Sequence, residues 1–422
     1  MSDSINNGLQ SVIYHSVTGK VNDSFVGLKF DGNDMHIYFP ECYSISKDVD
    51  VARNEILALL RTIAIAKSAS KEHSRVYNTQ SSDGGFALFS YLWMIKDYLE
   101  NGFYTNREKV YAKNVNGKIN WQKTVRGNAF LSDNNLFFPS IVVERKSNVD
   151  NILVEIHKLC VKKSIDYIGW LFNLKSDYII TPRFTNALKK FYLNTIKHEL
   201  DQTFLDSKRL LLTHMKNVLD GLDEGTNNKE FVYGVDTYNY IFEKMVDSVF
   251  GNTEHISDFY PSSKWQLRKY NYAEKDGSKL RPDTIILQKD IAIIIDSKYY
   301  RFGYTGEMED LPETTSIQKQ ITYGEFVLKN IRYPIITAYN AFLIPYDKTQ
   351  GDYKSQYDIQ YVGFAKSTWK DNRNDHELVH TFLIDLKYLV FNWNNSNHEE
   401  DVSRLVEMII KAQREAEKRI IK

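Results

Sequence analysis

Residues 281–301, RPDTIILQKDIAIIIDSKYYR, place one aspartate after a proline and a second after an unbroken apolar run. The strand-forming residues on either side of 288–290 predict an antiparallel hairpin. In such a hairpin Asp283 and Asp296 come together at the same end. Lys298 follows Asp296 by two residues and, because side chains alternate along a strand, lies on the same side. The stretch therefore predicts two carboxylates and one ammonium group at the end of a hairpin.

Phosphodiester hydrolysis is the chemistry that this trio favours. A divalent metal lowers the pKa of a water and neutralises charge on the phosphate, and Mg²⁺ accepts one or two protein carboxylates beside substrate phosphate. Asp283 and Asp296 are the predicted ligands, and Lys298 can orient the water or stabilise negative charge. Glu243, in the helical segment YIFEKMV, is the candidate for a further ligand. A hairpin merely capped by charges, with Glu243 on a helix surface, remains the alternative.

Two neighbouring segments favour a nuclease. Residues 264–281 carry six basic and two acidic residues with Trp and Tyr between them, which is typical of a surface that follows phosphates. The predicted DNA-binding residues are Lys264, Arg268, Lys269, Lys279, Arg281 and, beyond the hairpin, Arg301. In the segment 314–330, Gln320 and Tyr323 lie one helical turn apart, so both can face the site. A solvated loop and an ordinary amphipathic helix are the alternatives.

The order of predicted elements indicates the fold class. From 237 onward the pattern reads helix, basic connection, hairpin, helix, three strands and a closing helix from about 398. This order predicts an α/β (α+β) arrangement with a central mixed sheet flanked by helices. Upstream, the sequence predicts a hairpin around 31–34, helices over 50–69, 85–102 and 150–166, and a helical pattern throughout 183–222.

Domain boundaries follow from the same pattern. The polar segment 223–229 is the predicted boundary. It divides the chain into an N-terminal domain (1–182), a helical linker region (183–228) and a C-terminal domain (229–422). His157, in the helix 150–166, is expected to be packed or on the surface rather than a metal ligand, because no second ligand lies four residues away on its face.

Residues 108–128, EKVYAKNVNGKINWQKTVRGN, predict a Lys-rich hairpin about Asn116 and Gly117. The plain interpretation is a solvated two-stranded ribbon. The other is a projecting finger that docks on a protein or on phosphates. The predicted contact residues are Lys113, Asn116, Gly117 and Lys118.

Composition excludes several classes of protein. Lys plus Arg and Asp plus Glu both number 54, so the 422-residue chain is neutral, whereas a domain that binds nucleic acid alone is commonly basic. Two cysteines are too few for a thiolate zinc site and fit a reducing cytoplasm. No leader and no apolar run of membrane-spanning length is present, so we expect a soluble cytoplasmic protein without a membrane partner. No G-x-x-x-x-G-K-[ST] motif occurs, so the chain itself is not expected to bind a nucleotide.

The Pro282-Asp283 and Asp296-x-Lys298 arrangement resembles the PD-(D/E)xK nuclease superfamily. Its flanks narrow the resemblance to the nuclease (McrC-like) subunits of McrBC-like restriction systems, in particular the LlaJI family. The segments that carry it are IFEKMV…VFG (241–251), LRPDTIIL…IIIDSKYYR (280–301), SIQKQITYGEF (316–326) and, upstream, LFSYLWMIKDYLENGFYTNREKVYAKNVNGKINWQKTV (88–125).

The resemblance implies a restriction-endonuclease-like nuclease domain at 229–422, a partner-docking domain at 1–182 and a role for each candidate site residue. Asp283, Asp296 and Lys298 bind metal and activate water, with Glu243 and the pair Gln320 and Tyr323 beside them. It further implies Mg²⁺, for which Mn²⁺ can substitute, and double-stranded DNA as substrate. A separate AAA+ GTPase, McrB-like and ring-forming, would recognise DNA and translocate while the N-terminal region of this chain inserts into the ring and stimulates GTP hydrolysis. The hairpin at 108–128 is then the candidate finger.

Three hypotheses remain open from the sequence. The first is an Mg²⁺-dependent endonuclease subunit of a GTP-dependent restriction system for phage defence. The second is a self-sufficient type II restriction endonuclease. The third is a non-catalytic activator or scaffold of the motor, in which the acidic cluster is structural.

Overall fold

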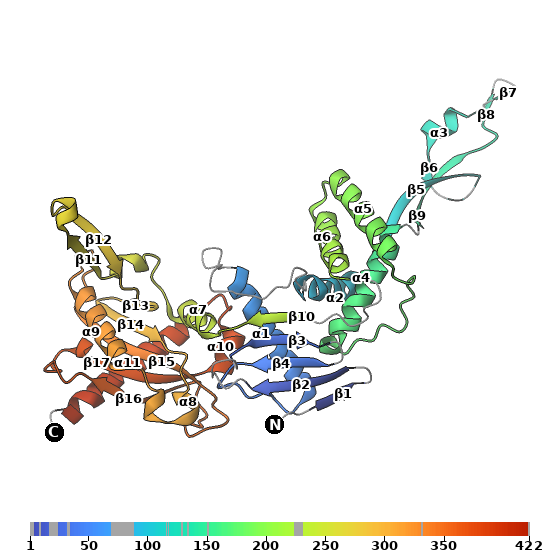
Figure 1. Ribbon diagram of the computed structural model, residues 1–422. Helices are drawn as coiled ribbons and strands as arrows, with labels where there is room; N and C mark the ends of the chain where they lie inside the picture. The colour runs from blue at the N-terminus through green and yellow to red at the C-terminus, as the bar shows by residue number, and fades with distance from the viewer. Residues whose placement is uncertain are drawn as a thin grey trace. The chain divides into compact units, whose positions relative to one another are not determined.

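The computed structural model describes residues 4–7, 10–16, 24–31, 34–68, 88–114, 116, 118–127, 130–132, 135–149, 152–222, 231–330 and 332–420. The chain forms two compact units, one from residues 1–80 together with 232–422 and the other from residues 81–231. The first unit contains the hairpin predicted within 281–301, and the second contains the segment 108–128, predicted to form a finger (Figure 1). Among the described residues, no helix combines the length and the apolar character needed to cross a bilayer.

The predicted hairpin forms at the edge of a five-stranded mixed sheet with the order β13-β14-β15-β17-β16. Its strands are β13 (Thr284–Gln288), β14 (Ile291–Ser297), β15 (Thr337–Tyr346), β16 (Ile359–Lys366) and β17 (Leu378–Asp385). The pairs β14–β15 and β15–β17 are parallel, whereas β13–β14 and β16–β17 are antiparallel. The expected mixed α/β organisation with its sheet in the middle is confirmed.

Helices pack on this sheet and bury its apolar strands. They are α7 (Asn239–Phe250), α8 (Phe302–Thr305), α9 (Thr314–Leu328), α10 (Leu386–Asn392) and α11 (Glu399–Ile420). Ala292 and Ile294 of β14 share a core with Tyr323 and Val327 of α9. Because side chains alternate along a strand, Asp296 belongs to the same face of β14 as Ala292 and Ile294. The face that packs against α9 therefore ends in an acidic residue.

A second sheet, of order β1-β2-β4-β3-β10, belongs to the same unit. Its strands are β1 (Ser4–Asn7), β2 (Gln10–Ser16), β3 (Val26–Phe30), β4 (Met35–Phe39) and β10 (Phe231–Val235), followed after β4 by helix α1 (Val49–Ser68). Gly27 has φ +144°, and a Cβ there would meet Tyr233 O at 2.2 Å. Only glycine therefore lets β3 approach β10 this closely.

Helix α1 of the N-terminal segment packs on the C-terminal part of the chain. Lys387 Nζ lies 2.7 Å from Glu55 Oε1, and the Trp393 indole donates a hydrogen bond to Thr62 Oγ1 at 3.0 Å. Helices α1, α7 and α10 lie between the two sheets (Figure 1). The sequence division into 1–182, 183–228 and 229–422 differs from this grouping, because β10 returns to complete the N-terminal sheet.

The second unit is helical apart from one extended arm. Its helices are α2 (Leu88–Asn101), α4 (Ile152–Ile168), α5 (Asn186–Gln202) and α6 (Asp206–Asp220). The helical pattern predicted throughout 183–222 is interrupted at 203–205, between α5 and α6. His157 is fully buried, and its Nδ1 accepts a hydrogen bond from the Tyr104 backbone N–H at 3.0 Å. It is a packed histidine, as expected.

The arm between α2 and α4 corrects the predicted hairpin at 108–128. Strand β5 (Asn106–Lys113) pairs along its whole length with β9 (Val142–Val149), and β6 (Lys118–Ile119) pairs with β9 as well. The second predicted arm is therefore not the partner of the first. It turns into helix α3 (Trp121–Val125), because Asn120 Oδ1 caps that helix by accepting from Lys123 N at 3.0 Å. Two further strands are β7 (Phe130–Ser132) and β8 (Asn135–Phe137).

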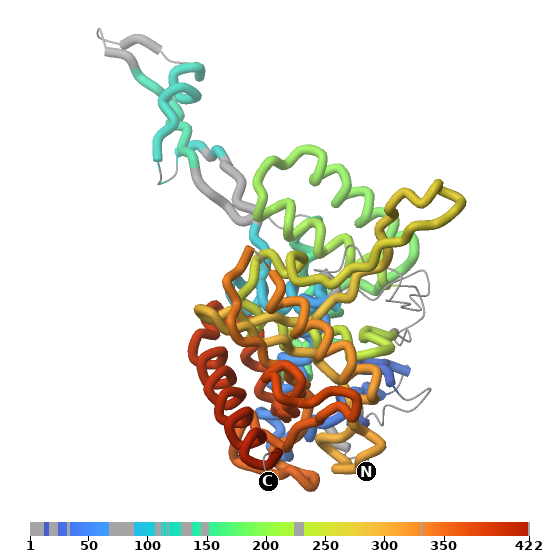
Figure 2. The backbone as a smooth tube through the Cα atoms, turned by 90° about the vertical axis from the view of Figure 1, so that its left-hand side faces the viewer, coloured from blue at the N-terminus to red at the C-terminus, as the bar shows by residue number. Residues whose placement is uncertain are grey.

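The arm has predicted contact residues inside and outside the described part of the chain. Lys113 and Lys118 are exposed, and Asn116 is described, whereas Gly117 lies outside the described residues. In two perpendicular views the arm extends away from the helices of its own unit (Figures 1 and 2). This placement is compatible with the finger hypothesis and equally with a solvated ribbon.

Short 3₁₀ helices connect several of these elements. They are η1 (Gly169–Phe172), η2 (Ile256–Phe259), η3 (Arg268–Tyr270), η4 (Met308–Asp310) and η5 (Asp375–Glu377). The two cysteines, Cys42 and Cys160, are both buried as free thiols.

Candidate active site

The two aspartates of the predicted trio meet at the end of the β13–β14 hairpin. Asp283 directly precedes β13, and Asp296 lies near the end of β14. The pairing of Thr284 with Ile295 puts both carboxylates at the same end of the ladder. The Ser297 backbone N–H donates a hydrogen bond to Asp283 Oδ2 at 2.8 Å, which fixes this carboxylate against β14.

Lys298 completes the group by pairing with Asp296. Its Nζ lies 2.5 Å from Asp296 Oδ2, and both side chains are mostly buried. Burial alone would lower the pKa of Lys298, but Asp296, with a further contribution from Asp283, raises it above its usual range. Lys298 is therefore held as a cation beside the two carboxylates.

Asp283 has a raised pKa because its carboxyl group is buried beside other carboxylates. Burial, with Asp296 and Glu243 adding to it, raises the pKa of Asp283 to about 8. The Ser297 N–H and Lys298 oppose this shift without cancelling it. A carboxyl group held partly protonated near neutral pH, in a site with like charges, is typical of a functional position.

Helix α7 brings two carboxylates toward the hairpin. Burial raises the pKa of Glu243, with Asp296 adding to the shift and Lys298 opposing it, so Glu243 interacts electrostatically with the trio. Asp247 lies one turn further along the helix, and its Oδ1 accepts a hydrogen bond from Thr284 Oγ1 at 3.1 Å. Sequence reasoning missed Asp247, although its four-residue spacing from Glu243 was a signal for a shared helix face.

Helix α9 contributes Gln320 and Tyr323. Burial raises the pKa of Tyr323 to about 12, and Asp296 and Asp283 add to this shift, so the phenol interacts electrostatically with the carboxylates. Gln320 is fully buried, and within the described residues neither atom of its side-chain amide has a hydrogen-bond partner. An unpaired buried amide is costly, which makes it a candidate to bind water or a substrate oxygen.

The donor set fits a hard divalent cation. Within the described residues, no group of three His, Cys, Asp or Glu side chains is arranged to hold a metal ion, so Glu243 does not form a ready-made three-carboxylate site. Mg²⁺, however, commonly takes one or two protein carboxylates and completes its shell with water and phosphate. Asp283 and Asp296 supply this minimum, and a cation between them would relieve the repulsion that raises the pKa of Asp283.

The predicted basic connection before the hairpin is itself a two-stranded ribbon. Strands β11 (Ser262–Gln266) and β12 (Glu274–Lys279) pair antiparallel. Lys264, Arg268, Lys269, Lys279 and Arg281 all lie on it or at its base, and all are exposed. Lys264 Nζ pairs with Glu274 Oε2 at 2.7 Å, so its charge is partly offset. Arg281, at the base of the ribbon, precedes Asp283 by two residues. The exposed basic residues of the ribbon are therefore close in sequence to the start of the hairpin.

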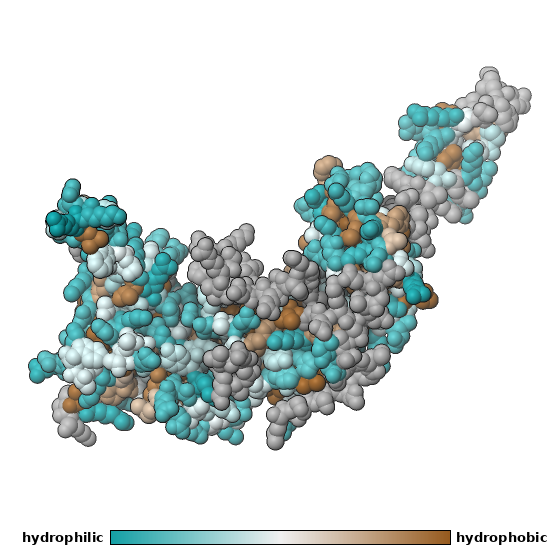
Figure 3. Space-filling model, in the orientation of Figure 1, coloured by the Kyte–Doolittle hydropathy of each residue, from teal (hydrophilic) through white to brown (hydrophobic). Residues whose placement is uncertain are grey.

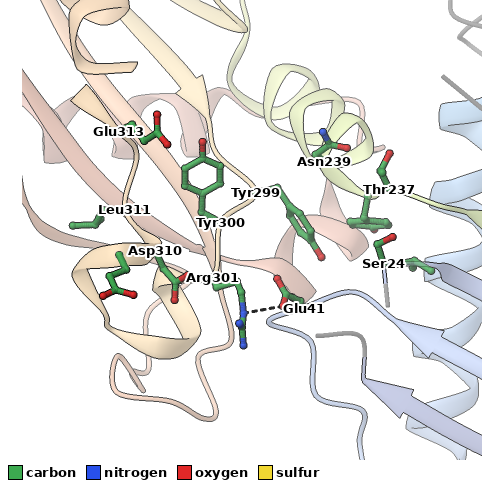
Figure 4. A pocket seen from close by; sticks show the side chains of 13 residues that line it. Ser24, Glu41, Thr237, Asn239, Tyr299, Tyr300, Arg301, Asp310, Leu311 and Glu313 are labelled. Carbon is green, nitrogen blue, oxygen red and sulfur yellow. Dashed lines mark ion pairs between the residues drawn. The ribbon is translucent and has the colours of Figure 1, made fainter. Parts of the chain in front are cut away.

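Arg301 has a different environment from the ribbon cations. Its Nε lies 3.1 Å from Glu41 Oε1, and the pair borders a cavity of about 450 Å³ (Figure 4). Tyr299 and Tyr300, which follow Lys298 directly, also line the cavity, whereas the described lining does not include Asp283, Asp296 or Lys298. The DNA-binding role predicted for Arg301 therefore competes with an ion pair to the N-terminal segment.

Comparisons with known proteins add a family. The family described as LlaJI restriction endonuclease matches residues 25–368 of this chain. No curated protein matches it. Among solved structures, a chain in the assembly titled as Thermococcus gammatolerans McrB AAA+ hexamers with bound McrC is 15% identical over 87% of this chain and 81% of that chain, with a TM-score of 0.36. Of these matches, only that to the family supports a conclusion about the chain.

Proposed function

The chain belongs to the LlaJI restriction endonuclease family and is therefore a nuclease, and we propose that Asp283, Asp296 and Lys298 form its active site. There the chain cuts duplex DNA in a metal-dependent reaction. The single observation that supports this site best is the convergence of the two carboxylates and the ammonium group at one end of the β13–β14 hairpin. The raised pKa of Asp283 and the unpaired amide of Gln320 point to the same place.

Each residue has a role that follows from its position. Asp283 and Asp296 would hold Mg²⁺, or Mn²⁺ in its place, and the bound cation would lower the pKa of a water and neutralise charge on the phosphate. Lys298, held as a cation by Asp296, stabilises negative charge on the phosphate oxygens and orients the attacking water. Gln320 offers its amide to water or phosphate, and Tyr323 keeps α9 against the carboxylates.

Glu243 remains a proposed additional ligand. It interacts electrostatically with the trio but is not part of a preformed three-carboxylate site in the described residues. Asp247 orients Thr284, the first residue of β13, and so positions Asp283 rather than binding substrate itself. Together these helix residues support the hairpin from the α7 side.

We further propose that cutting requires a separate AAA+ GTPase. The sequence resemblance to nuclease subunits of McrBC-like systems, the zero net charge and the lack of a nucleotide-binding motif support this division of labour. A neutral chain has no general attraction for DNA, so a partner that holds DNA would raise the local substrate concentration at the site. The arm formed by β5, β6, α3 and β9 is the proposed docking element.

The partner requirement predicts a simple mixing result. The purified chain with Mg²⁺ and duplex DNA should cut slowly or not at all, and adding an McrB-like AAA+ GTPase partner together with GTP should raise the rate by at least about a hundredfold, since tethering alone can supply that factor. Product formation on a gel measures the rate, with a GTP-free mixture as the control. Efficient cutting at a defined site by the lone chain would instead establish a self-sufficient restriction enzyme.

The docking proposal predicts that charge reversal on the arm weakens assembly. Lys113→Glu combined with Lys118→Glu should reduce the affinity for the GTPase roughly tenfold, because both lysines are exposed and reversal turns attraction into repulsion. Analytical ultracentrifugation or surface plasmon resonance measures the affinity. The control is Lys354→Glu combined with Lys366→Glu, since both lysines are exposed, lie in the other unit and give the same change of net charge. Normal assembly of the double variant would remove the arm from the interface.

A further inference from the structure

The β11–β12 ribbon presents aromatic side chains as well as cations. Trp265 is 55% exposed and Tyr272 is 62% exposed. A two-stranded ribbon has no core of its own in which to bury such rings. Figures 1 and 2 show the ribbon extending away from the central sheet, and Figure 3 shows it as a mostly hydrophilic projection. Together with Leu267 and Tyr270, these rings form a group of exposed apolar side chains on the ribbon, and such groups mark interaction sites.

The backbone at the tip is strained at Tyr272, which carries one of these rings. Asn271 and Tyr272 have φ values of 51° and 58°, so both occupy the left-handed region. Asparagine tolerates this conformation, but for a bulky residue such as tyrosine it is an outlier. The Tyr272 N–H donates to Leu267 O at 3.0 Å, which fixes the turn. Backbone strain of this kind gathers at functional sites, where the position of a side chain matters more than local stability.

The rings differ in what already covers them. Tyr270 lies under two cations, with Lys275 Nζ at 5.3 Å and Lys269 Nζ at 5.6 Å from its ring centre. Across the ribbon from Trp265, Gly277 leaves room for the indole, since a Cβ there would come within 2.8 Å of Trp265 Nε1. Among the ring and cation contacts of the described residues, none involves Trp265 or Tyr272. Tyr272, and the part of the Trp265 indole that does not lie against Gly277, are therefore open to a partner.

The ribbon is anchored to the candidate active site. Leu280 N donates to Pro261 O at 2.8 Å and closes the base of the ribbon, and the Arg281 backbone is hydrogen-bonded to the Tyr323 hydroxyl. Asp283 follows two residues later. From Tyr272 to Asp283 an extended chain reaches at most about 36 Å, which is about one turn of B-form DNA. Anything gripped at the tip is therefore close to the cleavage point.

We propose that the ribbon is a wedge whose Trp265 and Tyr272 stack on bases and part the stack of duplex DNA within about one helical turn of the phosphate to be cut. This inference rests on the proposed nuclease function and defines its substrate as a locally opened duplex. The excess of basic residues in 264–281, six against two acidic, is complementary to a polyanion. Stacking is tolerant of sequence, and the cost of opening a base step is offset by the contacts that the opened DNA makes.

The test measures base unstacking without cleavage. The full-length chain carrying Asp296→Asn is titrated into duplexes of about three helical turns in which 2-aminopurine, a base that brightens when it is unstacked, occupies successive positions. We expect a several-fold rise in fluorescence at one or two neighbouring positions. Tyr272→Asn should abolish this rise and weaken binding roughly tenfold, because a stacking contact is lost. Trp265→Ala should act in the same direction.

The variants separate stacking from folding and from charge. Asparagine suits the left-handed backbone, so Tyr272→Asn keeps or improves ribbon stability, and Tyr272→Phe should retain the signal. Tyr357→Ala, an equally exposed tyrosine outside the ribbon, is the matched control. Lys279→Ala should weaken binding and reduce its salt dependence while the remaining bound complex still brightens.

Two results would overturn the wedge. One is unchanged fluorescence and affinity with both Tyr272→Asn and Trp265→Ala. The other is loss of GTPase binding alone in these variants, which would assign the ribbon to a protein interface. Because the fluorescence experiment requires no cutting, failure of the wild-type chain to cleave DNA in the presence of Mg²⁺, the GTPase and GTP counts against the proposed function and is distinguishable from failure of the wedge.

Discussion

Asp296→Asn should lower the rate of DNA cleavage by at least about a thousandfold while leaving the chain folded. The aspartate is a proposed metal ligand and also holds Lys298, whose Nζ lies 2.5 Å from Asp296 Oδ2, so one substitution removes a ligand charge and releases the cation. Asparagine keeps the size of the side chain and one acceptor oxygen. Single-turnover cleavage in the presence of the GTPase, GTP and Mg²⁺ measures the rate.

Lys298→Ala should have a similar effect on cleavage but a different effect on stability. It leaves the carboxylates of Asp296 and Asp283 without their cation, so we expect a lower melting temperature in the absence of metal. Lys370→Ala is the matched control, because it also removes a lysine paired with a carboxylate, that of Glu325, away from the hairpin. Partner binding and GTPase stimulation should persist in all three variants. Unchanged cutting by Asp296→Asn would place the active site elsewhere and favour the scaffold hypothesis.

The hairpin at the centre of these experiments could be predicted because its information is local. A two-residue turn at 289–290 joins two strands, and one of them is an unbroken apolar run, so the register that brings Asp283 to Asp296 follows from counting residues. Most helices could also be predicted, because an apolar stripe of helical period lies within each segment. The sequence predicts a central sheet, but not that β14, β15 and β17 pair in parallel, because nothing within a strand specifies a distant neighbour.

The errors and omissions share a physical cause. Strand β5 pairs with β9, about thirty residues away, and not with the residues after Asn116, because Asn120 starts a helix where the sequence suggested a second arm. Strand β10 joins a sheet formed some two hundred residues earlier, and Gly27 and Gly234 allow the close approach of the two strands. Such long-range contacts depend on the whole fold, so no sequence window contains them.

Asp283→Asn should abolish metal-dependent cleavage and at the same time stabilise the chain in the absence of metal. The wild-type carboxyl group is buried beside Asp296 and Glu243, which raises its pKa to about 8. Keeping it ionised at neutral pH is therefore unfavourable to folding. The amide oxygen of asparagine can still accept the hydrogen bond from Ser297 N, so the hairpin keeps its geometry. We expect a gain on the order of 2 kcal/mol at pH 8, reduced from the full shift because the site retains some solvent.

The pH dependence of this gain has a definite sign. An acid whose pKa is raised by folding binds its proton more tightly in the native state, so the wild-type chain loses stability as pH rises from about 4 to about 8. The asparagine variant lacks this loss. The difference in melting temperature between the two chains, measured in EDTA, should be small near pH 4 and grow toward pH 8.

Mg²⁺ should make the wild-type chain more stable than Asp283→Asn, the reverse of the order expected in EDTA. Mg²⁺ binds the folded wild-type chain and stabilises it by mass action, whereas Asp283→Asn lacks one ligand charge and should gain little. Thermal unfolding at pH 8 with and without Mg²⁺ measures both effects, and Asp258→Asn, a surface carboxylate paired with Arg332, is the control. If the variant is less stable than the wild type in EDTA, the carboxylate is a structural cap. If it is more stable, the ionised Asp283 destabilises the metal-free fold, and only a bound cation makes this charge favourable, as expected of a catalytic metal site.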